Sequence, residues 1–506
     1  MSQSRAAIRS DAATGPFAFD NSYARLPERL FARLDPTPVA APELVRLNRP
    51  LAELLGADVE RLAGSDGAAI FSGNAVPDRA QPLAMAYAGH QFGQWVPQLG
   101  DGRAILLGEV VGRDGVRRDI QLKGSGRTPF SRMGDGRAAL GPVMREYILS
   151  EAMTALGVPS SRSLAFALTG ERVLRQDGPE QGAVLTRVAR SHVRVGTFQF
   201  FLARDDREAL AALSDYVIAR HDPDLAEADN PPLELLKAVI ARTADLVAQW
   251  QLIGFIHGVM NTDNMQLAGE TIDYGPCAFI DRYHPDTVYS SIDQFGRYAY
   301  RNQPPIAAWN MARFAETLLP IMAETPQEAV PLAEDALEGF APHFQQRLTA
   351  GWRAKLGLTE AQDDDLALAV DLLGHMAEQG ADFTLTFRAL CDLTRAPGPA
   401  DEALSAMFAE PAAVQAWTAR WRQRLAGETA SDTARRAAMR AANPAYIPRN
   451  HQVEQAIQAA RQTGDFSVMD RLMHVLAQPF DDHPGYEDLA RPPRPEQEVH
   501  QTFCGT

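Results

Sequence analysis

The chain has 506 residues, 45% of them hydrophobic and 22% charged, which is typical of a soluble protein with about two or three separately packed lobes. The net charge of −15 argues against general nucleic-acid binding, and no run of about eighteen apolar residues occurs, so we expect neither a nucleic-acid partner nor a membrane partner. Three cysteines are too few for a disulfide framework, and the N-terminus lacks an apolar signal core. The cysteines are Cys277, Cys391 and Cys504. Both features indicate a cytoplasmic protein.

Positive charge is concentrated in one part of the chain. Between residues 100 and 200, fifteen Lys and Arg residues stand against ten Asp and Glu, so the rest of the chain carries about −20. A basic region in an acidic protein indicates an anionic ligand there. The alternative for any single arginine is an ordinary solvated surface residue.

The first 190 residues divide into an extension and a strand-rich lobe. Residues 1–80 predict an N-terminal extension with short helices, at 27–35 and 41–56. Residues 81–190 predict a kinase-like N-lobe. Its expected elements are strands at 103–111 and 116–123 around a Gly-Arg-Asp-Gly turn, a basic loop at 124–137, a helix over 141–157, and strands at 163–170 and 182–189.

From residue 191 onward the apolar spacing is helical. Long amphipathic helices are expected at 231–255, 307–324, 369–379 and 412–427, followed by a C-terminal tail over 481–506. The order of elements predicts an α+β, protein-kinase-like two-lobed fold, with a strand-rich N-lobe and a larger helical C-lobe over 191–480. The helices of 302–427 provide either core support or a substrate-docking surface.

The segment from His257 to Pro276 carries residues that a kinase-like site requires. A kinase places a catalytic Asp two residues after a His, a metal-binding Asn five residues later, and an Asp-Phe-Gly triplet beyond. Here Val259 stands at the position of the catalytic Asp, Asn264 at that of the Asn, and Asp273 begins Asp-Tyr-Gly. Oxygen ligands of this kind suit Mg²⁺, and we expect them at the two ends of a hairpin formed by 265–272.

Asp263 is the carboxylate left beside the expected ion. It is the candidate base for an incoming hydroxyl, a role that Val259 cannot fill. The alternative for Asn264 and Asp273 is ordinary hydrogen bonding to turn backbone. Their position after a long helix, in the correct order of lobes, favours the metal site.

Lys123 ends the second strand of the N-lobe, where a kinase carries its phosphate-binding lysine. Either Glu146 or Glu151 on the following helix could pair with it, and Glu146 is favoured because it lies one turn inside the helix. The alternative is a surface lysine at a strand end.

Two Gly-Asp-Gly-Arg sequences replace the glycine-rich loop of kinases. The first contains Gly100, Gly102 and Arg103, and the second contains Asp135 and Gly136. Glycine allows backbone N–H groups to approach phosphate closely, and arginine adds a bidentate donor. The alternative is a pair of ordinary Asp-Gly turns.

Arg187 and Arg194 lie where the strands lead into the helical lobe. In a kinase that region receives adenine, but two arginines suit a phosphate tail better. We therefore expect ATP to bind the other way round, with Asp263 facing the α-phosphate. Attack by a hydroxyl there transfers AMP and releases pyrophosphate, so Val259 does not make the protein inactive.

With these residues the sequence resembles the selenoprotein O family of protein adenylyltransferases, which have a kinase-like fold. The motifs that carry the resemblance are YAGHQFGQWVPQLGDGRA, QLKGSGRTPFSRMGDGRAALG, GFIHGVMNTDNM, TIDYGP and NPAYIPRNHQVEQAI, which fall within residues 85–457. The resemblance implies AMP transfer from ATP to Ser, Thr or Tyr hydroxyls of proteins, the enzyme itself among the candidates.

The same resemblance implies the roles of individual residues. Asp263 is the proton acceptor, while Asn264 and Asp273 hold Mg²⁺, with Mn²⁺ as the alternative metal. The residues expected to contact ATP are Gly100, Gly102, Arg103, Lys123, Asp135, Gly136, Arg187, Arg194 and Asp273.

Some members of the family carry selenocysteine near the C-terminus, and Cys504 takes that place here. A redox role needs a partner thiol, for which Cys277, close to Asp273, is favoured over Cys391. The alternative is a free thiol without function.

Two other functions fit the same fold. One is a kinase that transfers the γ-phosphoryl group to a protein or small molecule, which Val259 and the two arginines argue against. The other is a silent nucleotide-binding scaffold, which the carboxylate at Asp263 argues against, because a scaffold needs no base beside the metal.

Overall fold

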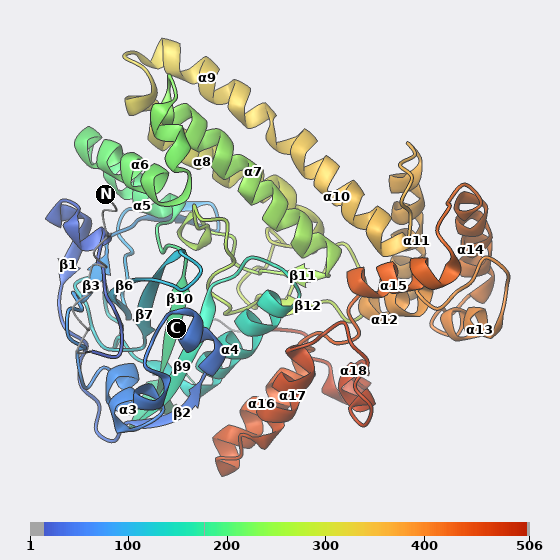
Figure 1. Ribbon diagram of the computed structural model, residues 1–506, viewed down its shortest axis with the longest axis horizontal. Helices are drawn as coiled ribbons and strands as arrows, with labels where there is room; N and C mark the ends of the chain where they lie inside the picture. The colour runs from blue at the N-terminus through green and yellow to red at the C-terminus, as the bar shows by residue number, and fades with distance from the viewer. Residues whose placement is uncertain (1–14, 177, 503–506) are drawn as a thin grey trace, which may run out of the picture.

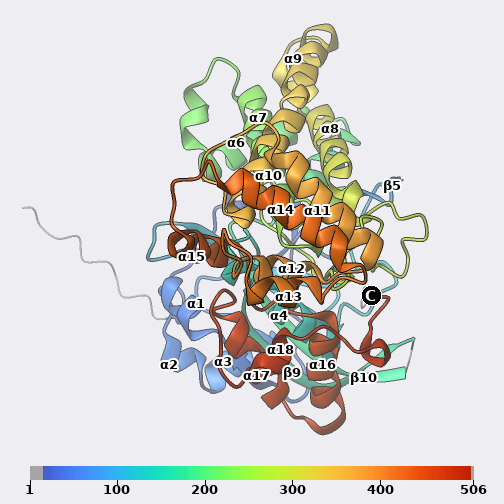
Figure 2. The same cartoon turned by 90° about the vertical axis from the view of Figure 1, so that its right-hand side faces the viewer.

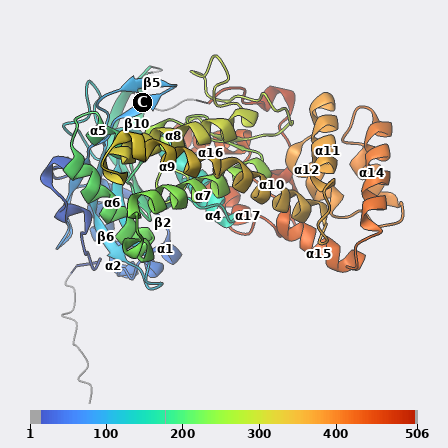
Figure 3. The same ribbon diagram turned by 90° about the horizontal axis from the view of Figure 1, so that it is seen from above.

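An antiparallel sheet with a few short helices forms the N-terminal part of the chain, and helices make up nearly all of the rest (Figure 1). The computed structural model describes residues 15–176 and 178–502. Seen from above, the sheet lies at one end of an elongated molecule, and helices α11, α14 and α15 lie at the other (Figure 3). The predicted α+β fold, with a strand-rich N-terminal lobe and a helical C-terminal lobe, is confirmed.

The main sheet has eight strands in the order β1–β3–β6–β7–β10–β9–β2, with β8 paired to β10. Their bounds are β1 (Phe31–Arg33), β2 (Glu43–Leu47), β3 (Leu83–Met85), β6 (Ala104–Val111), β7 (Arg117–Lys123), β8 (Ala138–Ala139), β9 (Arg162–Arg175) and β10 (Gly178–Ala189). The four strands predicted between 103 and 189 are thus present, although β9 and β10 are longer than expected. Helix α4 (Leu140–Ala155), also predicted, packs against β9 and β10.

The helix predicted at 27–35 is limited to one 3-10 turn, Glu28–Leu30, and the helix predicted at the start of 41–56 is wrong. Residues 31–33 and 43–47 instead form β1 and β2, the two edge strands of the main sheet. In β2, Val45 packs against one hydrophobic cluster, whereas Leu44 and Leu47 pack against another. Pairing with β9 and partial burial of these side chains on both faces outweigh the local helical spacing. The remaining short helices here are α1 (Arg49–Leu54), α2 (Val59–Leu62) and α3 (Ser65–Ser72).

The long helices predicted in the C-terminal lobe are present. The helices are α5 (Val195–Leu202), α6 (Arg207–His221), α7 (Pro231–Leu252), α8 (Gln303–Met322), α9 (Pro326–Glu338), α10 (Phe340–Leu356), α11 (Asp365–Gln379), α12 (Phe383–Leu390), α13 (Pro399–Ser405), α14 (Pro411–Leu425), α15 (Asp432–Ala442), α16 (Asn450–Thr463), α17 (Ser467–Leu476) and α18 (Glu487–Ala490). Within the described ranges, no helix is both long and apolar enough to cross a bilayer.

Helix α7 forms the centre of the helical lobe, packed against α8 and α10. The chain then returns, because α16 and α17 pack against α4 of the strand-rich lobe, near β9 and β10 (Figure 2). Two short strand pairs complete the fold: β4 (Gly89–Gln91) with β5 (Gln94–Val96), and β11 (Phe255–Ile256) with β12 (Ala278–Phe279).

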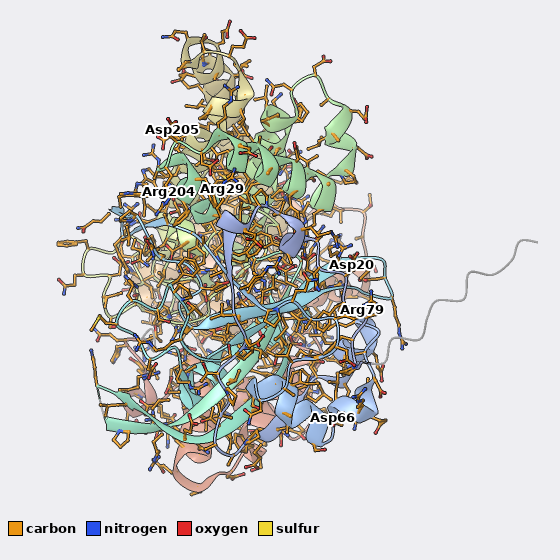
Figure 4. The ribbon with its side chains drawn as sticks, turned by 90° about the vertical axis from the view of Figure 1, so that its left-hand side faces the viewer. Asp20, Arg29, Asp66, Arg79, Arg204 and Asp205 are labelled. Atoms are coloured by element: carbon orange, nitrogen blue, oxygen red, sulfur yellow. The ribbon has the colours of Figure 1, made fainter. Side chains whose placement is uncertain are left out.

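An ion-pair cluster ties the N-terminal segment to the helical lobe. Arg29 pairs with Asp206 at 2.6 Å and with Glu208 at 2.8 Å, just at the start of α6. Figure 4 shows Arg29 on the same side of the molecule as Arg204 and Asp205. The two lobes are therefore joined on this side as well as through the chain connection after β10.

Candidate active site

The charged residues predicted to form the site meet where β7, β10, α4 and the loop after β11 come together. Lys123 ends β7, Glu146 lies in α4, and Arg187 lies in β10. Lys123 Nζ is 2.6 Å from Glu146 Oε2, which confirms the predicted pair. Glu151, the other candidate, instead bonds Arg162 at 2.7 Å.

Glu146 and Arg187 are almost fully buried, and Arg187 Nε donates to Glu146 Oε1 at 2.7 Å. Burial alone disfavours the charged carboxylate, but Arg187 and Lys123 outweigh it and lower the pKa of Glu146. Glu146 is therefore an ionised anchor that holds two cations at the site.

Asp273 is the second carboxylate at this point, and three cations converge on it. Lys123 Nζ lies 3.3 Å and Arg187 Nη2 2.7 Å from Oδ1, and Arg194 Nη1 lies 3.1 Å from Oδ2. Burial opposes ionisation, yet Arg187, Lys123 and Arg194 hold the pKa of Asp273 well below its usual range. Asp273 also has a left-handed backbone with φ 63°, a conformation that Asp tolerates better than most residues.

Asp263 lies next to this cluster but in a different environment. Its residue exposure is only 7%, and burial raises the pKa of its carboxyl to about 6, with Arg194 and a hydrogen bond from Gln91 opposing the rise. Gln91 Nε2 donates to Oδ2 at 3.3 Å, whereas Oδ1 is buried without a hydrogen-bond partner among the described residues. Arg194 Nη1 donates to the backbone carbonyl of Asp263 at 2.7 Å, so one arginine connects Asp263 with Asp273.

Asn264 follows Asp263 in a single 3-10 turn, Thr262–Asn264. Its Nδ2 donates to the carbonyl of Val259 at 2.9 Å, which leaves Oδ1 as the atom free to bind a cation. The side chain of Val259 is buried, and its backbone N–H donates to Nδ1 of His257. His257 Nε2 in turn bonds the carbonyl of Ile272 at 2.8 Å, so the histidine supports the loop.

The hairpin predicted over 265–272 is wrong. Residues 255–256 and 278–279 form the strand pair instead, and the chain between them is a loop held at single bridges to other segments. Gln266 bridges to Arg194, and Thr271 bridges to Ser160. The loop is thus fixed by residues distant in sequence, which local periodicity cannot reveal.

The two Gly-Asp-Gly-Arg loops are built on close backbone contacts. A methyl group on Gly100 would lie 2.4 Å from the ring of Phe130, and one on Gly102 would lie 2.9 Å from the carbonyl of Phe130. A methyl group on Gly136 would lie 2.2 Å from the backbone of Gly126. These glycines are therefore required for packing of the loops, whatever else they bind.

Asp135 points to the surface side of its loop and pairs with Arg175 at 2.8 Å. Burial opposes its ionisation, but the bond from Arg175 and the charge of nearby Arg103 lower the pKa of Asp135. The two loops are therefore close enough to interact. Among the described residues, Asp135 forms no hydrogen bond or ion pair with Lys123, Asp273 or the two buried arginines, so its predicted nucleotide contact stays a prediction.

The β4–β5 hairpin belongs to the site, although the sequence analysis assigned it no role. The backbone N–H of His90 donates to Thr262 Oγ1 at 2.7 Å, and that of Phe92 donates to Asn261 Oδ1 at 2.9 Å. Because the side chain of Gln91 also donates to Asp263, three consecutive residues of the hairpin contact the 261–263 segment. The glycines on both sides of His-Gln-Phe are the only local signal for such a tight turn.

Replacing Gly89 with alanine should lower activity by about 10²-fold with little change in thermal stability, since misplacing a reacting group by about 1 Å has this effect. A methyl group there would lie 2.7 Å from Asp263 Oδ1, and the flexible carboxylate would move. Gly374→Ala, where a methyl group meets nothing within 4 Å, is the control. Turnover with label from ATP is the measurement, and full activity of Gly89→Ala would show that Oδ1 need not be in place.

The side chains of Cys277 and Cys391 are buried. Cys504 lies outside the described residues, so the predicted bridge to Cys277 stays a prediction. The tail does reach this region, because Thr502 Oγ1 donates to the carbonyl of Pro276 at 2.6 Å.

A strand lysine paired with a helix glutamate, together with an Asn and an Asp-Tyr-Gly aspartate from the other lobe, is the arrangement that a kinase-like nucleotide site requires. The comparisons identify the family. A sequence model described as protein adenylyltransferase SelO matches residues 16–477. The chain belongs to this family and is an enzyme, a nucleotidyltransferase.

Close relatives carry the name protein nucleotidyltransferase YdiU. A protein of Rhodopseudomonas palustris (strain BisB5) is 61% identical over 490 residues, which is 97% of this chain and 99% of the relative. A protein of Alkalilimnicola ehrlichii is 62% identical over 488 residues, 96% of this chain and 98% of the relative. A protein of Rhizobium leguminosarum bv. trifolii is 58% identical over 499 residues, 99% of both chains.

Proposed function

We propose that the protein transfers AMP from ATP to Ser, Thr or Tyr hydroxyls of proteins, with ATP inverted relative to kinases. The observation that carries the proposal is the convergence of Lys123, Arg187 and Arg194 on Asp273 beside a buried, unpartnered oxygen of Asp263. Two deeply buried arginines at the end of the strand-rich lobe suit triphosphate oxygens better than the apolar ring of adenine.

The transfer step follows from the position of Asp263. The acceptor hydroxyl oxygen attacks the α-phosphorus, the bond from that phosphorus to the bridging oxygen breaks, and pyrophosphate leaves. Asp263 Oδ1 accepts the hydroxyl proton. The raised pKa, about 6, makes Asp263 a better proton acceptor than an ordinary aspartate while leaving it mainly ionised at neutral pH. Lys123, Arg187 and Arg194 stabilise the charge of the leaving pyrophosphate.

The residues present fit a divalent metal held chiefly by the nucleotide. Asn264 Oδ1 and the Asp273 carboxylate are hard oxygen donors, and no group of three or more His, Cys, Asp or Glu suited to a metal occurs in residues 15–176 and 178–502. Mg²⁺ uses few protein ligands where phosphate oxygens complete its shell, and Mn²⁺ accepts the same donors. The metal, when bound, would neutralise phosphate charge.

ATP labelled at either the α- or the γ-phosphate tests the proposal. With Mg²⁺ and added lysate proteins, we expect protein-bound label from the α-position alone. Label from the γ-position would establish phosphoryl transfer, and Arg187 and Arg194 would then need another role. Bound nucleotide without label from either position would favour a scaffold.

Metal and nucleotide should bind cooperatively. In the structure both Asp273 oxygens accept from cations, so Mg²⁺ must compete with Lys123 and Arg187 at Oδ1. Phosphate oxygens would draw these cations away and release the carboxylate. We expect a non-hydrolysable ATP analogue to raise Mg²⁺ affinity by at least about tenfold, and Mg²⁺ to raise analogue affinity by the same factor. Titration calorimetry measures both, and equal Mg²⁺ affinity with and without the analogue would contradict the idea.

A further inference from the structure

An aromatic surface, with Arg297 and Arg313 stacked on one of its rings, lies beside Asp263. Its starting point is the β4–β5 hairpin, whose backbone is bonded to Asn261 and Thr262. From there the ring of His90 lies 5.0 Å from that of Trp95 and 5.3 Å from that of Trp309 in α8. The surface therefore has a fixed position relative to the proposed base.

Arg297 extends this surface. Its guanidinium lies 4.9 Å from the ring centroid of Trp309, and a methyl group on Gly93 would come within 3.3 Å of it. Trp95 and Phe295 are 39% and 97% exposed, although large apolar side chains are usually covered. We call His90, Trp95, Arg297 and Trp309, together with Phe295 two residues before Arg297 in the chain, the acceptor surface.

Arg297 has no carboxylate within ion-pair distance in the part of the chain that the structure describes. The carboxylate of Asp293, which is close in sequence, accepts hydrogen bonds from the backbone N–H groups of Arg297 and Tyr298, at 2.9 and 2.8 Å. Nε of Arg297 is buried without a described hydrogen-bond partner. The neighbouring Arg313, by contrast, pairs with Glu316 at 2.6 Å.

Arg297 places on this surface a positive charge without a paired carboxylate among the described residues, in a chain whose net charge is −15. Burial lowers the pKa of His90, and the charges of Arg313 and Arg297 lower it further. A stacked arginine without a carboxylate partner attracts an anionic group, and Trp and Arg are enriched among the residues that dominate protein interfaces.

We propose that the acceptor surface binds the protein substrate, with Arg297 pairing with an Asp or Glu of the substrate close to the target hydroxyl. Trp95 and Phe295 pack against apolar side chains of the same segment. This inference rests on the proposed function and adds a class of substrate to it. The substrate is a protein in which an Asp or Glu precedes or follows the residue that carries the target hydroxyl.

The test uses two pools of synthetic peptides with one Ser each. One pool has Asp or Glu, and the other Lys, at the positions two to four residues from the Ser. Transfer of α-phosphate label from ATP gives kcat/KM for each pool. We expect the full-length protein to favour the acidic pool by about tenfold, the effect of one partly desolvated charged hydrogen bond.

Arg297→Glu should reverse this preference, and Arg297→Lys should retain most of it. Arg301→Glu is the matched control, since it makes the same charge change in the same segment, but Arg301 pairs with Asp286 at 2.7 Å. Trp95→Ser should raise KM for the acidic pool with little change in kcat, and the fold should stay intact because Trp95 is exposed. ATP-analogue affinity should stay the same in all four variants.

Unchanged preference in Arg297→Glu, with AMP transfer intact, would overturn the inference and leave the proposed function standing. Weaker analogue binding by Arg297→Glu would assign Arg297 to the nucleotide and also overturn it. If the parent protein transfers no α-phosphate label to any peptide or lysate protein, the proposed function and this inference are both overturned.

Discussion

Replacing Asp263 with asparagine should lower the rate of AMP transfer by about 10²- to 10⁴-fold, the usual contribution of a general base. Asparagine keeps the size of the side chain and can still accept the bond from Gln91. It cannot take a proton from an attacking hydroxyl. Affinity for an ATP analogue should change little, because the contact of Arg194 is to the backbone carbonyl of Asp263.

Single-turnover label transfer and analogue titration separate the two effects. Asp371→Asn, a surface substitution in α11 whose carboxylate pairs with Arg420, is the matched control and should behave as the parent. Retained transfer in Asp263→Asn would mean that the hydroxyl proton goes elsewhere. Loss of analogue binding would mean that Asp263 acts on the nucleotide instead of on the acceptor.

Much of the fold could be predicted from local pattern. The β6–β7 hairpin has a Gly-Arg-Asp-Gly turn between two β-rich runs, and α7 has a continuous apolar stripe, so each element is specified by its own residues. By contrast, β2 is a strand because it pairs with β9, more than one hundred residues away. Such pairing leaves no signal in residues 43–47 themselves.

In the site as well, some contacts could be predicted from local sequence and others depend on distant segments. The spacing of Lys123 and Glu146 along one strand and one helix predicted their contact, which the structure confirms. The bonds of Gln91 to Asp263 and of Phe92 to Asn261 join segments about 170 residues apart, and neither partner has an unusual local pattern. The sequence also could not predict that three cationic side chains contact Asp273, because these contacts depend on how separate elements pack together.

Replacing Asp273 with alanine should abolish AMP transfer and also lower the free energy of unfolding by about 3 kcal/mol, as when one partner of a buried ion pair is removed. The side chain of Arg187 is only 2% exposed and would keep Glu146 as its one carboxylate partner. Arg194 would lose its 3.1 Å contact. A φ of 63° adds strain for alanine, so Asp273→Asn, which tolerates this backbone, should lose less stability but equally lose transfer.

A second substitution separates the stability effect from the catalytic one. Adding Arg187→Met to Asp273→Ala removes the buried cation left without its partner and should restore much of the lost stability in denaturant titrations. It should not restore AMP transfer, because the carboxylate proposed to hold the metal is still absent. Equal stability of Asp273→Ala and the parent would show that solvent, and not Asp273, compensates the arginines. Recovery of transfer in the double variant would show that Asp273 serves only to balance charge, and Asn264 would then be left as the sole proposed metal ligand.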